Sequence, residues 1–155
     1  MGTQQILLIV LSVIIVGVAI AVGISMFNSQ AYNSNKSGIA ADAQSFATQI
    51  VQYYKTPQSQ GGFGGGSAVD ADGNLIELDE AAIAGYLGFD ANTFSTTNEN
   101  GTYTISIDET SGYPIITGVG SAEKGGYNPQ VITTVELPSG EITAVASDVE
   151  VETEG

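Results

Sequence analysis

One stretch constrains this chain more than any other: residues 6–27, which read ILLIVLSVIIVGVAIAVGISMF. Fifteen of these residues are Leu, Ile, Val or Phe, and no charged side chain precedes Lys36. At roughly −0.3 to −0.6 kcal/mol for each such residue at a bilayer centre, the stretch favours membrane insertion by roughly 4 to 9 kcal/mol. As a helix it is roughly 33 Å long, which is enough to cross a hydrocarbon core of ~30 Å. Lipid offers the backbone no hydrogen-bond partners, so we expect a helix despite the many Ile and Val residues.

A second helical pattern follows the polar residues 28–37. Apolar residues recur there at spacings of three and four: Ile39, Ala43, Phe46, Ile50, and Tyr53 or Tyr54. This stripe predicts an amphipathic helix whose apolar side must pack on another element. If residues 28–37 are helical too, residues 3–54 form one rod roughly 80 Å long. The Asn/Ser-rich run and Gly38 are the weakest helix formers, and a bend or break would fall there.

The pattern changes after the rod. Residues 56–67, TPQSQGGFGGGS, are typical of a flexible linker, because Pro57 disfavours a continued helix and Gly dominates the rest. An Asp72-Gly73 hairpin is expected next, followed by a short helix, EAAIAGYL, capped by Asp79 and ended by Gly88. Alternating apolar residues then predict four strands: Thr102–Asp108, Tyr113–Val119, Gln130–Leu137 and Glu141–Val151.

Together these patterns predict an α+β fold. A long N-terminal helix, apolar in its first half and amphipathic in its second, packs on a small antiparallel sheet. The expected division is a helix over residues 1–55, a Gly-rich linker over 56–67 and an antiparallel β head over 68–155. The apolar face of the sheet is expected to carry Tyr103, Ile105, Ile107, Ile115, Val131, Val135 and Ile142.

Composition excludes several classes of chemistry. The chain has 17 acidic residues against three Lys, a formal net charge of −14, and no Arg, His or Cys. A Ser-His-Asp triad, a zinc site built on His or Cys, and an arginine clamp on phosphate therefore cannot form. The negative charge would repel a phosphate backbone, so direct nucleic-acid binding is not expected. We expect neither catalysis nor a cofactor.

The nearest approach to a metal site is VDADGNLIELD, where Asp70, Asp72 and Gly73 match part of a calcium-binding EF-hand loop. Ala68 stands at the first ligand position, and Asp79 stands where the pattern has a Glu. A plain Asp-Gly turn explains the segment better, so Asp70, Asp72 and Asp79 are incomplete candidates and no metal is expected. Two short sequons, Asn35-Lys36-Ser37 and Asn100-Gly101-Thr102, match the glycosylation pattern, which has many chance matches.

An apolar helix that continues into an amphipathic half ending in QIVQYY, a Gly-rich connection and a small antiparallel β head together resemble the type IV pilin family. The chain departs from the family at two places. At the position where members typically carry Glu, this chain has Gln5, or Leu7 if cleavage follows Gly2. At the position where a helix-breaking Pro is common, it has Val22. The resemblance implies a subunit held in the inner membrane, handled by pilus assembly machinery, and polymerised into an extracellular filament of identical subunits with the helices inside.

The expected assembly interface lies on the apolar helix: Gln4, Gln5, Leu8, Leu11, Ile15, Gly17, Ala19, Ala21, Gly23 and Phe27. Small residues four apart let helix backbones approach closely, and the two Gln residues can hydrogen-bond between neighbours. Two alternatives stay open. The helix can remain in lipid as the anchor of an envelope binding module, or the chain can be a minor pilin or pseudopilin that forms no long fibres.

Overall fold

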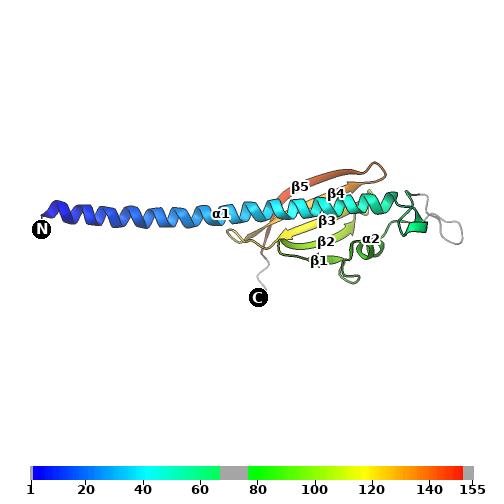
Figure 1. Ribbon diagram of the computed structural model, residues 1–155, viewed down its shortest axis with the longest axis horizontal. Coiled ribbons are helices and arrows are strands. Elements are labelled where there is room, and N and C mark those ends of the chain that lie inside the picture. The colour runs from blue at the N-terminus through cyan, green and yellow to red at the C-terminus, as the bar shows by residue number, and fades with distance from the viewer. Residues whose placement is uncertain (1, 67–76, 152–155) are drawn as a thin grey trace.

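The computed structural model describes residues 2–66 and 77–151. Its dominant element is α1, a single helix over Thr3–Lys55 whose first half projects beyond the head (Figure 1). The helix runs through residues 28–38 without the break that their composition allows. The absence of a side chain at Gly38 lets the head pack closely on α1, because a Cβ atom at this position would lie 3.0 Å from Oδ1 of Asn100 in the head. The weak helix formers thus lie where the rod first meets the sheet.

The Gly-rich segment after α1 is more ordered than its composition predicts. Helix η1 spans Gln58–Gln60, and the chain then folds back so that the Phe63 N–H donates to the Tyr53 carbonyl at 2.9 Å. The Phe63 side chain is buried and stacks on Tyr54 with ring centroids 5.5 Å apart. One aromatic residue therefore attaches a segment expected to be a flexible linker to the end of the rod.

The head is a five-stranded antiparallel sheet in the order β1-β2-β3-β4-β5, preceded by helix α2. The bounds are α2 Glu80–Leu87, β1 Ser95–Thr97, β2 Gly101–Ile107, β3 Pro114–Gly120, β4 Tyr127–Glu136 and β5 Glu141–Glu150. The predicted short helix and four strands are confirmed, and β1 is an addition. The hairpin expected at Asp72-Gly73 lies outside the described residues.

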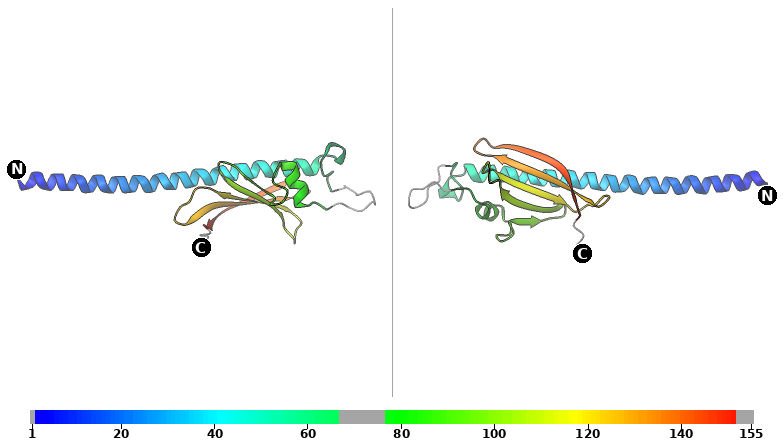
Figure 2. Two further views of the ribbon diagram at one scale, coloured as in Figure 1. Left: turned by 90° about the horizontal axis from the view of Figure 1, so that it is seen from below. Right: turned by 180° about the vertical axis from the view of Figure 1, so that it is seen from behind.

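The second half of α1 covers one face of this sheet (Figure 2). The predicted stripe is buried at Ile39, Ala43, Ile50 and Tyr53, together with Ala47. Phe46 packs edge-on against Phe89 and Tyr103, with ring centroids 5.0 and 5.2 Å apart. The core of the head therefore forms between α1, α2 and the helix-facing side of the sheet.

One predicted core residue is wrong. Ile115 points away from α1, and its neighbour Ile116 is fully buried and lies beside Ile105 in the register of β2 and β3. Two adjacent Ile residues leave the direction of alternation ambiguous in the sequence. Gly118 resolves this ambiguity. It lies opposite Tyr103 on the helix-facing side, where a Cβ atom would be 3.1 Å from the Tyr103 ring. The Tyr103 ring thus determines which side of β3 faces the helix.

Candidate assembly surface

The first half of α1 is an apolar surface with no cover inside the described chain. Between Ile6 and Phe27, sixteen large apolar side chains are each at least half exposed, and Phe27 reaches 75 %. Burying the exposed part of these side chains is worth on the order of 20 kcal/mol. This helix is long and apolar enough to cross a membrane. A rod with this surface requires lipid or other protein around it.

The helix distributes the predicted interface residues over two sides. At about 100° per residue, one row along α1 contains Gln4, Leu8, Leu11, Ile15 and Ala19, with Gln5 and Gly23 beside it. Phe27 lies between this row and the opposite side. Gly17 and Ala21 lie on the roughly opposite side. Small residues that permit close helix approach are therefore present on both sides of the rod, which suits contact with more than one neighbouring helix.

Gly17 and Gly23 have no explanation within the described chain. A Cβ atom at either position would meet nothing within 4 Å among the described residues. Glycine inside a helix costs about 1 kcal/mol relative to alanine, so its presence calls for a compensating contact. A close approach by a second helix supplies such a contact.

Three polar residues of the apolar half differ in whether the helix itself satisfies their side chains. The Ser12 hydroxyl donates to the Leu8 carbonyl at 2.7 Å, so it is already satisfied within the helix. Gln4 and Gln5 are exposed in the first turn, where a helix leaves backbone N–H groups without intrahelical acceptors. The sequence analysis expects their amides to hydrogen-bond between neighbouring copies, and in the helix both residues are exposed.

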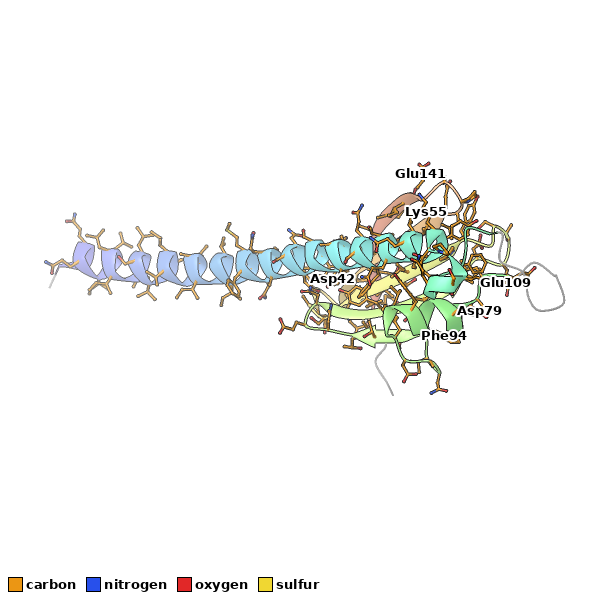
Figure 3. All side chains as sticks on the ribbon, turned by 45° about the vertical axis from the view of Figure 1, so that its right-hand side comes forward. Asp42, Lys55, Asp79, Phe94, Glu109 and Glu141 are labelled. Atoms are coloured by element: carbon orange, nitrogen blue, oxygen red, sulfur yellow. The ribbon has the colours of Figure 1, made fainter. Side chains whose placement is uncertain are left out.

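A junction that the sequence analysis missed joins the rod to the head at Asp42, which lies where α1 enters the head (Figure 3). Its Oδ2 atom accepts hydrogen bonds from the Tyr103 hydroxyl at 2.7 Å, Asn100 Nδ2 at 2.7 Å and Asn98 Nδ2 at 2.9 Å. The bond from Asn100, followed by that from Tyr103, lowers the pKa of the Asp42 carboxyl. One carboxylate on α1 thus holds the β1–β2 turn and the largest buried side chain of the sheet.

A second polar contact joins α1 to the edge strand β5. Lys36 Nζ and the Tyr32 hydroxyl both donate to Oδ1 of Asp148 at 2.7 Å. Burial, and then the bond to Asp148, raises the pKa of Tyr32 to about 12. The Lys36 bond, followed by the Tyr32 bond, lowers the pKa of Asp148. The carboxylate of Asp148 on this edge strand is therefore paired with the rod.

The side chains of the two sequon residues, Asn35 and Asn100, also belong to the junction at Asp42. Asn35 Nδ2 donates to the Asn100 carbonyl at 2.7 Å, and Asn35 Oδ1 accepts from the Ala122 N–H at 3.1 Å. The Asn100 side chain is bonded to Asp42. Both amides thus position the head on α1.

Of the three incomplete metal candidates, only Asp79 lies within the described residues. Asp79 caps α2, accepting a hydrogen bond from the Ala82 N–H at 2.6 Å, and Asp70 and Asp72 lie outside the described range. In residues 2–66 and 77–151 there is no group of three acidic side chains placed to hold a metal ion.

Compared with family models, curated proteins and solved structures, the chain matches none of them. The case for its function therefore rests on its own geometry.

Proposed function

We propose that this chain is the structural subunit of an extracellular, type IV pilus-like filament. In this proposal the apolar half of α1 anchors the chain in the inner membrane until pilus assembly machinery transfers it into a growing homopolymer. The helices then lie inside the filament, and the acidic head lies outside. The chain performs no catalysis, and the filament is its functional form.

The observation that carries the proposal is the apolar half of α1, exposed on every side and containing two glycines that serve no contact within the described chain. Packing against identical helices removes from water the same apolar area that lipid covers, so leaving the membrane costs little net free energy. Small residues on two sides allow neighbours on two sides, which a continuous polymer requires and a simple lipid anchor does not.

The head supports the same role. The Asp42 and Asp148 contacts attach the sheet to the second half of α1, so force applied to the rod is transmitted to the head through buried packing and these polar bonds. One continuous helix passes from the apolar segment into the head without a hinge (Figure 1). A subunit that joins a filament through its rod therefore presents its head at a defined position.

The deciding experiment compares Gly23→Leu with Val22→Leu, a matched variant at the next position. Cells producing each full-length chain are sheared, and the released material is viewed by negative stain with an antibody against the head. We expect fibres from wild type and Val22→Leu. Gly23→Leu should lose them while the chain stays in the membrane fraction, because a Leu side chain prevents close helix approach.

Other outcomes distinguish the alternatives. If the wild-type chain is always in the membrane fraction and never in fibres, the helix is a lipid anchor and the head is an envelope binding module. If antibody marks only rare positions in fibres built from another protein, the chain is a minor pilin. Fibres that persist in Gly23→Leu would refute close packing at this glycine.

A further inference from the structure

The face of the sheet turned away from α1, here called the outer face, has an unusual composition for so acidic a chain. Along the five strands eighteen side chains point to this face, and sixteen of them are uncharged. The two acids, Glu136 and Glu141, are paired at its margin beside the β4–β5 turn. Seen from behind the sheet, no helix or strand of the described chain covers this face (Figure 2).

The outer face consists of regular rows of small and β-branched residues. Its central row crosses all five strands in register: Ser95, Thr104, Thr117, Ile132 and Val145. Val145 and Ile132 lie side by side in this row, and their side chains are 59 % and 36 % exposed. None of the residues that these described strands direct to the outer face is aromatic, so the platform on which sugars usually stack is missing.

We propose that the outer face binds the outer face of a second copy of this chain in a neighbouring filament, so that filaments associate side by side. This inference rests on the proposed filament. If the apolar halves of α1 form the filament core, the sheet face covered by α1 is turned toward the core and the outer face is turned to solvent. It is then available to another filament.

Charge makes the outer face the surface through which two copies can meet with the least repulsion. Each chain carries a formal charge of −14, so two copies repel each other wherever their acidic turns and edges meet. Glu99 and Glu109 lie in the turns at the two ends of β2, outside the outer face. Contact through the outer face brings together neutral surfaces and keeps the acids at the rim, which is the approach of two copies that costs least.

The available area sets the strength of one such contact. With strands about 4.8 Å apart and a rise of about 3.3 Å per residue, the outer face covers roughly 500 Å² on each copy. A pair then buries roughly 1,000 Å², near the lower limit for a specific interface. One contact is weak, but a filament repeats it at every subunit, and multivalent binding multiplies the affinity without any new contact.

The test uses purified filaments of the full chain. Low-speed centrifugation pellets bundles, and high-speed centrifugation then pellets single filaments. The variant Val145→Glu places a charge on the outer face, and Ala144→Glu places one at an exposed position on the other face of the same strand. Raising NaCl from about 0.01 to about 0.15 M shortens the Debye length from roughly 30 to 8 Å and should bring wild type and Ala144→Glu into the low-speed pellet. Val145→Glu should stay as single filaments, with an unchanged high-speed pellet.

The proposal is overturned if wild-type filaments stay single at the higher salt, or if Val145→Glu forms bundles as readily as Ala144→Glu. Single filaments that instead bind a neutral polysaccharide through this face would also overturn it, in favour of a carbohydrate ligand. A near-ultraviolet circular dichroism spectrum equal to that of wild type shows that Val145→Glu is folded.

A second measurement separates this proposal from the filament itself. The chain has no Cys, so Thr117→Cys and Ala144→Cys each introduce a single thiol into the detergent-solubilised full chain. A short bismaleimide should link Thr117→Cys into dimers and leave Ala144→Cys monomeric. If no filaments form but Thr117→Cys still links, face pairing stands and the filament proposal fails. If filaments form and the two variants link equally, face pairing fails alone.

Discussion

Removing the Asp42 carboxylate should loosen the head from the rod. The Asp42→Ala variant deletes one acceptor shared by three donors: the Tyr103 hydroxyl and the side-chain amides of Asn98 and Asn100. Hydrogen bonds to a charged group are worth about 1.5 to 3 kcal/mol each. The two Asn amides lie near the surface, where water replaces much of the lost bond, so we assign them about 0.5 to 1 kcal/mol each. Tyr103 is fully buried, and its unpaired hydroxyl adds about 1.5 to 2 kcal/mol.

The sum predicts a loss of about 3 kcal/mol from the free energy of unfolding, a large part of the 5 to 15 kcal/mol typical of a domain. For a chain of this size the melting temperature should fall by roughly 6 to 12 °C. The assay is near-ultraviolet circular dichroism of the full chain in detergent. The seven Tyr residues report on the head, because all of them lie beyond the apolar half of α1.

Two further variants isolate the cause. Tyr103→Phe keeps the buried ring and removes only the donor, so its effect combined with Asp42→Ala should be smaller than the sum of the two single effects. Gln44→Ala changes an exposed residue on the same helix and should stay within about 0.5 kcal/mol of wild type. If Asp42→Ala is equally close to wild type, or if the pair is additive, the reasoning on this junction is wrong.

Three smaller predictions follow from other contacts. The pKa of the Asp42 carboxyl is lowered in the folded state, so wild type should be more stable than Asp42→Asn. This difference in the free energy of unfolding should be fully present above about pH 4 and should shrink as the pH falls below it. Urea unfolding at several pH values measures it. Gly120→Ala should destabilise the head by about 1 to 3 kcal/mol in the same assay, because its Cβ atom would clash with Asn35 Oδ1. Gly85→Ala, with open space at its Cβ position, should stabilise by about 0.5 to 1 kcal/mol, and the opposite order would refute the packing. Asp79→Ala should cost about 1 kcal/mol by removing the cap of α2, measured as a lower urea midpoint, whereas equal midpoints would show that the cap contributes nothing.

Periodicity accounts for most of what could be predicted about the fold. The apolar run, the 39–53 stripe and the alternating strands each repeat a pattern that only one kind of element can bury, so α1 and β2–β5 follow from local sequence. β1 could not be found in this way, because Ser95–Thr97 is short and polar and is a strand only through its pairing with β2. The choice between Ile115 and Ile116 likewise depends on a partner strand.

The polar junctions between α1 and the sheet lie beyond sequence reasoning for the same reason. Asp42 is next to the buried Ala43 on α1, and this position at the border of the stripe is the only local sign that its carboxylate faces the head. Its partners come 56 to 61 residues later in the chain. The partner of Lys36 comes 112 residues later. Such pairs follow from the register of the sheet under the helix, which single-sequence patterns do not specify.

The two halves of the chain have opposite effects on the proposed polymer. Packing of the rods replaces lipid with protein around the same apolar side chains, so the net gain per subunit is much smaller than the ~20 kcal/mol that separates the rod from water. Each added subunit also brings another −14 charge close to its neighbours, and this repulsion extends over roughly 30 Å at 0.01 M salt but only about 8 Å at 0.15 M. A small gain opposed by a screened repulsion makes growth depend on ionic strength. Filament length, measured on electron micrographs, should therefore increase with NaCl in wild type and in Val145→Glu alike, because that substitution changes lateral contact and leaves the rods intact.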